Sequence, residues 1–410
     1  MLEILKQELK NFKSPLYRNS IYISLASLTT AVAGFLFWAI AARLYPAKDV
    51  GVASAIVSAL NLTFNLSMLG MNFAIIRFYP EYKERAIGSA LIITSIASVA
   101  FSVAYGLIMI CSGSFGDLGW GFVGVFVLFS VIGTLYNVLY TYSVARRRAE
   151  HGFVQSLLFA GRFVFLFLLI GMGLLGILLS FGLGLFFGLF YVLLFVDFKS
   201  LLVIDLDFLR ESFRFAFGNY IIGLSNIAPA YIMPTLLLLI LSKEEVAYYY
   251  IASMVGMTFL LVLNAINTSF FVEGSYNCDI LKTTLKKAIF ISYVYLGGAF
   301  TFVLALGDVI LGLFGEKYIA GTALLWLIIL SGFLSIPANF LITTLNILRL
   351  VKKATIISVL KSFLSILFSY LFVLKYGITG VGLGINAAYL VILVIILIIY
   401  RDTIQPVISS

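Results

Sequence analysis

The feature that most restricts the fold of this chain is a series of apolar segments, each long enough to cross a lipid bilayer. A helix needs about 20 mostly apolar residues to span the hydrocarbon core, and such segments recur twelve times between short polar stretches. Hydrophobic residues occupy 62% of the 410 positions and charged residues only 11%. A chain with this composition has too few charged residues to include a large soluble domain. The sequence predicts an all-α polytopic membrane protein with twelve transmembrane helices. The expected spans are 19–44, 50–76, 86–111, 120–144, 153–175, 177–196, 213–241, 246–271, 284–307, 321–347, 354–374 and 378–400.

Basic residues alternate between the two sides of these spans. If the N-terminus lies in the cytoplasm, 20 of the 27 lysines and arginines fall in cytoplasmic segments and five in outer ones, and Arg162 and Lys361 remain inside spans. Cytoplasmic loops carry such an excess in membrane proteins. The alternation supports the count of twelve and predicts a plasma or inner membrane protein with both termini in the cytoplasm. The net charge of +9 then matches an anionic inner leaflet and does not indicate a nucleic-acid partner.

Short motifs recur about two hundred positions apart. Asn19 opens the first span and Asn219 lies near the start of the seventh, while Gly182-Leu-Gly184 in the sixth span matches Gly382-Leu-Gly384 in the twelfth. Their common offset indicates an internal repeat of six helices. Because six is even, the two halves are expected to share one orientation and to be related by a pseudo-twofold axis along the membrane normal. A substrate site is then expected between them, near the middle of the membrane.

The repeat and its flanking segments predict the organisation of the chain. Leu2, Leu5, Leu9 and Phe12 have helical spacing with lysines between them, which is typical of a helix on the membrane surface. The expected parts are an interfacial N-terminal helix at 1–18, an N-lobe at 19–196, a cytoplasmic connector at 197–211, a C-lobe at 212–401 and a C-terminal tail at 402–410.

Arg162 and Lys361 are candidate substrate-binding residues because they lie inside spans. A charge at the centre of a bilayer costs roughly 2.5 to 3.5 kcal/mol on insertion scales and normally faces water or a partner. Arg162 lies about 16 Å of helix from His151, near the midplane, whereas Lys361 is close enough to Lys353 to snorkel to the inner surface. Every carboxylate falls at a span end or in a loop. We therefore expect the two cations to line one cavity and to bind an anion such as a phosphate or pyrophosphate group.

Asparagines and prolines within the spans are the next candidates. Asn61 and Asn65 share a helix face at i, i+4 and are expected to line the cavity, although hydrogen bonding between helices is the alternative for any asparagine in a membrane. Pro229 and Pro234 in the seventh span and Pro337 in the tenth each remove a helical hydrogen bond. These prolines predict kinks that would suit a gate.

The chain carries no sequence signature of an enzyme, a metal site or a cofactor site. Cys111 and Cys278 are expected on opposite sides of the membrane and cannot pair, and His151 is expected in a solvated loop beside a basic cluster. No phosphate-binding loop, dinucleotide fingerprint or nucleophile motif lies in a suitable context. The longest outer loop, 308–320, is too short to carry the catalytic residues of an enzyme that transfers or polymerises sugars. We expect no enzymatic activity and no cofactor.

Three motifs resemble those of a known family. Asn19-Ser-Ile-Tyr22 is followed by Ala42-Arg-Leu-Tyr-Pro-Ala-Lys-Asp-Val-Gly51 and by Leu69-Gly-Met-Asn-Phe-Ala-Ile-Ile-Arg77. They resemble the first two helices of the polysaccharide-exporter, or oligosaccharide flippase, branch of the multidrug/oligosaccharidyl-lipid/polysaccharide (MOP) flippase superfamily. The six-plus-six layout extends the similarity over the whole chain.

The resemblance implies a MATE-like, V-shaped pair of lobes that moves a polyprenyl-(pyro)phosphate-linked oligosaccharide to the outer leaflet by alternating access. It also implies cationic residues in a central cavity, for which Arg162 and Lys361 are the candidates. Arg43 and Arg77 match the motifs, but they lie at helix ends where snorkelling is an equal explanation. The expected partners are the lipid-linked oligosaccharide, membrane lipids and a glycan polymerase or glycosyltransferases.

Two other classes of protein compete with this interpretation. A cation-coupled multidrug (MATE-type) antiporter has the same layout, but it needs a carboxylate within a span, and this sequence places none there. A cationic cavity would also repel cationic drugs. A channel or scaffold would not account for a two-lobe repeat with kinked helices. The membrane potential, an anion gradient and downstream polymerisation are all compatible with the sequence as energy sources for transport.

Overall fold

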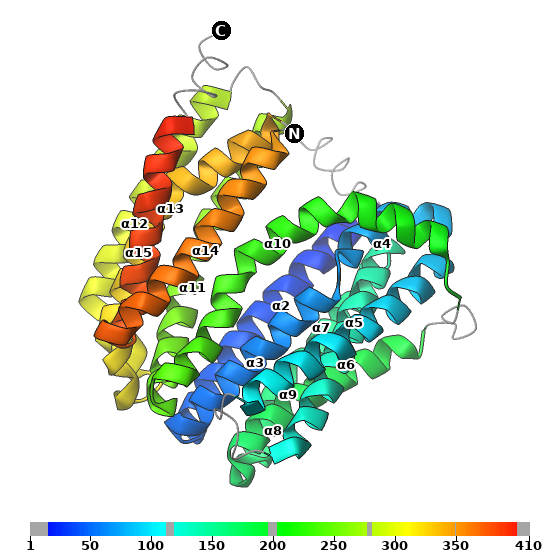
Figure 1. Ribbon diagram of the computed structural model, residues 1–410, viewed down its shortest axis with the longest axis horizontal. Coiled ribbons are helices and arrows are strands. Elements are labelled where there is room, and N and C mark those ends of the chain that lie inside the picture. Colours follow the sequence, from blue (N-terminus) through cyan, green and yellow to red (C-terminus); the bar gives the residue numbers. More distant parts are fainter. Residues whose placement is uncertain (1–14, 112–118, 196–202, 277–280, 349, 400–410) are drawn as a thin grey trace, which may run out of the picture. The chain divides into compact units, whose positions relative to one another are not determined.

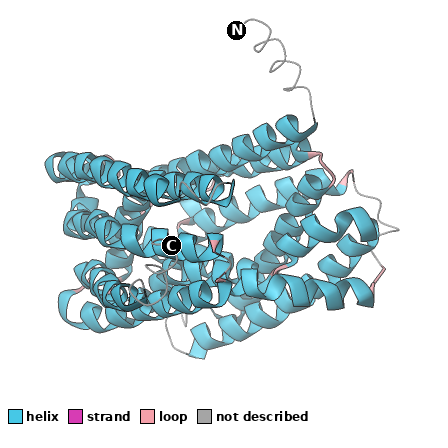
Figure 2. Cartoon of the chain, turned by 90° about the horizontal axis from the view of Figure 1, so that it is seen from above, coloured by secondary structure: helices cyan, strands magenta, loops and turns pink. Residues whose placement is uncertain are grey.

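The described part of the protein is helical throughout. A computed structural model describes residues 15–111, 119–195, 203–276, 281–348 and 350–399, and these ranges contain helices and short loops but no strand (Figure 1 and Figure 2). Within these ranges, twelve segments are long and apolar enough to cross a membrane, which confirms the predicted fold class. The elements are α2 (Pro15–Leu44), α3 (Ala47–Ser67), α4 (Met71–Tyr82), α5 (Glu84–Cys111), α6 (Gly119–Ala145), α7 (Ala149–Ala160), α8 (Arg162–Leu168), η2 (Ile170–Met172), α9 (Leu174–Leu193), α10 (Leu206–Ile240), α11 (Lys243–Tyr276), α12 (Leu281–Gly312), η4 (Glu316–Gly321), α13 (Thr322–Ile347), α14 (Val351–Tyr376) and α15 (Thr379–Ile399).

The fifth span ends earlier than the sequence predicted. It consists of α7 and α8 and ends at Leu168, where a short 3-10 turn and Gly173 lead into α9. Gly173 has a φ of 54°, a backbone conformation that glycine adopts without the steric cost of a Cβ. Hydropathy alone placed the end at residue 175 because Leu169 and Ile170 in the link are as apolar as the helices on either side.

The helices form two compact units. Unit 1 comprises 1–46 and 56–220, and unit 2 comprises 47–55 and 221–410. The chain therefore crosses between the units three times: once between Pro46 and Ala47 at the start of α3, once within α3 and once within α10. In the organisation predicted from the repeat, by contrast, the two lobes are joined by the connector at 197–211. The interfacial helix expected at 1–18 and the expected tail at 402–410 lie wholly or mostly outside the described residues, as does the first part of the connector.

The first half of α10 belongs to unit 1 because it buries one apolar stripe there. Phe208, Ser212 and Ala216 follow one another at four-residue spacing, and each is fully buried. The ring of Phe208 lies 6.4 Å from that of Phe78 and 5.6 Å from that of Tyr82 on α4. This buried stripe explains why the last part of the expected connector, from Leu206 on, is helical and packs on a core.

The first two turns of α3 belong to unit 2 because they pack closely on the start of α11. A Cβ on Gly51 would overlap the carbonyl group of Lys243 and would lie 3.1 Å from the backbone nitrogen of Ala247. Only a glycine permits this approach of two helix backbones. The motif Asp49-Val-Gly51 thus has a packing role.

The glycines of the sequence repeat make equivalent contacts in the two units. A Cβ on Gly182 in α9 would overlap the ring of Phe129 in α6, and a Cβ on Gly382 in α15 would lie 2.5 Å from the Cβ of Leu327 in α13. In both units, therefore, the last span packs against the fourth through a glycine. The sequence offset of two hundred corresponds to a shared packing arrangement.

Candidate functional site

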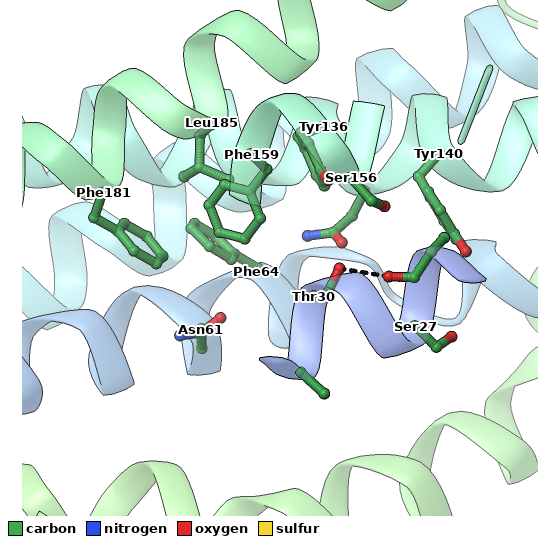
Figure 3. Close-up of a pocket in the computed structure, with 13 residues that line it drawn as sticks. Ser27, Thr30, Asn61, Phe64, Tyr136, Tyr140, Ser156, Phe159, Phe181 and Leu185 are labelled. Atoms are coloured by element: carbon green, nitrogen blue, oxygen red, sulfur yellow. Dashed lines mark hydrogen bonds between the residues drawn. The ribbon is translucent and has the colours of Figure 1, made fainter. Parts of the chain in front are cut away.

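Unit 1 contains a pocket of about 430 Å³. Its walls come from five helices that are far apart in the sequence, so the pocket forms only when the helices pack together. Figure 3 shows Phe64, Phe159 and Phe181 gathered toward one end and Ser27, Tyr140 and Ser156 toward the other. The lining residues are Ala26, Ser27, Thr30 and Ala31 of α2, Asn61 and Phe64 of α3, Tyr136, Asn137 and Tyr140 of α6, Ser156 and Phe159 of α7, and Phe181 and Leu185 of α9.

The polar side chains that line the pocket are uncharged, and hydrogen bonds within the protein occupy only part of their donors and acceptors. Asn61 donates from Nδ2 to the carbonyl oxygen of Val57 at 2.8 Å, and Asn137 donates to that of Gly133 at 2.9 Å. An asparagine has two N–H donors and a carbonyl acceptor, so each amide keeps one donor and its Oδ1 for a ligand. The pocket can bind hydroxyl groups, which both donate and accept.

The aromatic end of the pocket is held by ring packing. The ring of Phe159 lies 5.5 Å from that of Tyr136 and meets that of Phe181 edge to face at 5.6 Å. Gly188 of α9 gives the ring of Tyr136 its space, since a Cβ there would lie 2.7 Å from the ring. Such interlocked rings form a rigid apolar surface.

Arg162 lies directly behind this aromatic wall. Its Cζ is 3.7 Å from the ring centroid of Phe159, 5.4 Å from that of Phe181 and 5.2 Å from that of Phe37 in α2. The side chain is only 5% exposed, and Arg162 is not among the residues that line the pocket. Arg162 therefore does not line this pocket, and its role in a central cavity stays a prediction. The aromatic faces stabilise its cation in the apolar interior.

Lys361 belongs to a polar cluster in unit 2. Its Nζ donates to Oδ1 of Asn226 in α10 at 3.4 Å, and the next residue on α14, Ser362, donates to the backbone carbonyl oxygen of Ser225. The side chain of Lys361 is partly buried. An ammonium has three donors, so Lys361 can hold Asn226 and still bind an anion.

The prolines do not end their helices. α10 continues through Pro229 and Pro234, and α13 continues through Pro337. Proline has no N–H for the carbonyl four residues before it, so Pro229 leaves the carbonyl of Ser225 without its helical donor. Ser362 supplies a hydroxyl to that carbonyl.

Pro337 has the same effect on α13. It leaves the carbonyl oxygen of Phe333 without a helical donor, and the hydroxyl of Tyr293 in α12 donates to that oxygen at 3.4 Å. Two of the predicted kink sites are thus bound to a neighbouring helix. Whether Pro229, Pro234 and Pro337 also act in gating stays a prediction.

The hydrogen bond from Ser362 to the carbonyl oxygen of Ser225 is expected to contribute to the stability of the protein. Ser362→Ala should lower the free energy of unfolding by about 1 to 3 kcal/mol, because a buried carbonyl loses its donor. In a Pro229→Ala background the restored N–H can bond to Ser225, and the same change should cost only a few tenths of a kcal/mol. Thermal unfolding of the wild type, both single variants and the double variant would measure the difference. An equal cost in both backgrounds would contradict the assignment.

The other predicted site residues lie away from the pocket. Asn65 donates to the backbone carbonyl of Asn61 at 2.8 Å and does not line the pocket, whereas Asn61 does. Arg43 lies in the last turn of α2 and Arg77 lies on α4, and both are exposed. Sequence reasoning missed most of the lining, including Tyr136 and Tyr140, which form the polar face of α6 together with Asn137. Their i, i+1, i+4 spacing within one span was the available signal.

The twelve spans form two units, one of which holds a polar pocket, and they define a multi-pass membrane protein with the fold of a known class of transporters. Lipid II flippase MurJ in an inward closed conformation is similar with a TM-score of 0.76 and 15% identity, over 93% of this chain and 88% of that chain. An inward-facing multidrug resistance MATE family transporter of the MOP superfamily is similar with a TM-score of 0.74 and 15% identity, over 96% of this chain and 99% of that chain. No family model and no curated protein matches the sequence. At this level of identity the similarity establishes the shared fold.

Proposed function

We propose that this protein is a flippase. In this proposal it moves a polyprenyl-(pyro)phosphate-linked oligosaccharide from the cytoplasmic to the outer leaflet by alternating access, for polysaccharide or glycan biosynthesis. The pocket of unit 1 is the observation that carries the proposal, because it combines amides and hydroxyls with aromatic faces and has no charged lining residue. A pyranose ring presents hydroxyl groups at its edge and C–H groups on its faces. It can hydrogen-bond to Asn61 and Asn137 and pack on Phe159 and Phe181.

The same pocket argues against a cationic drug as the substrate. A cation entering it would find no carboxylate among the lining residues, and the Phe159 ring that could attract it already stacks on Arg162 at 3.7 Å. The positive charge behind the wall would repel the ligand. A multidrug resistance MATE family transporter shares the fold, so a cation-coupled MATE-type antiporter is the alternative function and not the preferred one.

Lys361 is the proposed contact for the phosphate of the substrate. Its Nζ is held by a neutral amide and not by a carboxylate, which leaves its charge available to an anion. Arg162 is proposed to act with it through the positive field at the sugar pocket, and Arg43 and Arg77 to meet phosphates at the membrane surfaces. The basic segments set the proposed orientation, with both termini in the cytoplasm.

A flipping assay tests the proposal. The protein is reconstituted in liposomes with a fluorescent polyprenyl-pyrophosphate oligosaccharide, and the label that reaches the other leaflet is measured. Asn61→Leu and Asn137→Leu should each lower the rate about tenfold, since each removes a hydrogen bond of roughly 1.4 kcal/mol. Asn65→Leu is the matched control and should stay within about twofold, because its amide lies outside the pocket and the pocket loses no hydrogen bond.

Two results would contradict the proposed function. One is a folded wild-type protein that does not flip the labelled lipid but exports a cationic drug when a cation gradient is applied. The other is equal flipping by the wild type and the Asn61→Leu/Asn137→Leu double variant, which would mean that the pocket does not hold the sugar.

A further inference from the structure

A second, small cavity lies in unit 1 where α6 ends and α7 begins. It has a volume of about 20 Å³, and its lining combines basic and aromatic side chains. This volume holds about one water-sized group, which is too little for a sugar but enough for oxygen atoms of an anion seated at its mouth. The lining residues are Tyr142, Ser143, Arg146, Arg148, His151, Val192 and Phe195.

Two of the three basic side chains of this cavity are held in place by tyrosines. Arg146 donates from Nη1 to the hydroxyl of Tyr142 at 2.7 Å, and its Cζ lies 5.1 Å from the centroid of that ring. Nδ1 of His151 lies 3.1 Å from the hydroxyl of Tyr191. The phenol is neutral, but Tyr142 also interacts with the carboxylate of Glu84, so Glu84 offsets part of the charge of Arg146.

Two carboxylates, Glu84 and Glu150, act on tyrosines of this cluster. Glu84 accepts a hydrogen bond from the hydroxyl of Tyr79 at 3.0 Å, and Glu150 lies 3.9 Å from Arg18. Among the described residues, Arg148 makes no ion pair and its side chain is exposed. Glu84 can offset one of the two arginine charges, and the cavity keeps the positive charge of Arg148.

We propose that this cavity binds the phosphate group of an anionic phospholipid in the inner leaflet. Guanidinium groups match the geometry of phosphate oxygens, and basic pockets between membrane helices on the cytoplasmic side are suited to anionic headgroups. The adjoining end of α9 offers apolar surface for the acyl chains, because Phe190 is 51% exposed, Leu194 65% and Phe195 52%. This lipid site is separate from the proposed sugar pocket, and its assignment to the inner leaflet rests on the proposed orientation of the chain.

The neighbouring arginines provide a matched experiment. Arg147 is exposed like Arg148 but does not line the cavity. Purified protein is titrated with phosphatidylglycerol, phosphatidylcholine or inorganic phosphate, and the midpoint of thermal unfolding is recorded. Phosphatidylglycerol should raise the midpoint of the wild type and of Arg147→Ala by about 3 °C. Arg148→Ala should lose most of that rise, and Arg148→Lys should keep part of it.

The outcomes distinguish a specific lipid site from non-specific attraction of an anionic lipid to surface arginines. If Arg147→Ala and Arg148→Ala lost the phosphatidylglycerol-dependent rise in midpoint equally, the proposal would be overturned. Any positive charge at the inner surface would then be enough to attract the lipid. Equal protection by phosphatidylcholine, or by inorganic phosphate alone, would overturn the assignment to an anionic lipid. The side chain of Arg148 is exposed and makes no ion pair among the described residues, so a folded Arg148→Ala protein is expected, and its midpoint without lipid serves as the check.

Discussion

Replacing Arg162 with alanine is expected to lower the flipping rate by about 30-fold or more. The guanidinium stacks on Phe159 and lies over Phe181, two rings that line the proposed sugar pocket. A desolvated cation–π contact is worth about 2 kcal/mol, which corresponds to roughly a 30-fold change in an equilibrium constant. Loss of this buried side chain would also leave space into which the rings can move.

Two further variants separate the charge of Arg162 from its shape. Arg162→Lys keeps the charge and should recover flipping in part, because an ammonium lacks the planar stacking surface of a guanidinium. Arg162→Met fills similar space without charge and should stay impaired. The liposome assay measures all three rates, with thermal unfolding as the check on folding. Normal flipping by a folded Arg162→Met protein would show that the charge has no role in transport.

Replacing Gly384 with valine is expected to have the largest effect on stability. Gly384 lies where α15 approaches α14 so closely that a Cβ would overlap the backbone of Ser369 and lie 2.6 Å from the carbonyl carbon of Phe368. The atoms it would meet belong to a helix backbone, which cannot rotate away as a side chain can. Forcing the helices apart should cost more than about 3 kcal/mol.

Gly298 in α12 provides the matched control for this substitution. It is also a helical glycine, but a Cβ there meets nothing within 4 Å. Gly298→Val should therefore change the midpoint of thermal unfolding by a few degrees at most, whereas Gly384→Val should abolish the folded protein or lower the midpoint severely. Equal midpoints for the two variants would contradict the close packing of α14 and α15.

The sequence by itself determined the number of spans and the fold class. Bilayer thickness sets a minimum length for an apolar helix, so the twelve segments could be recognised without any tertiary contact. The offset of two hundred residues between Gly182 and Gly382 also carried structural information, because both glycines make room for the fourth span of their own unit. The sequence likewise identified Arg162 and Lys361 as unusual, since a charge inside a span is costly wherever the helix faces.

Only the tertiary structure decided which faces of the helices look inward. In a soluble protein, an apolar stripe marks the face of a helix that packs on the core. Lipid is as apolar as a protein interior, so this signal is lost in a membrane helix. Sequence spacing could therefore not show that Asn61 lines the pocket while Asn65 does not, nor that Arg162 stacks behind Phe159. Those positions depend on the rotation of each helix, which packing against its neighbours fixes.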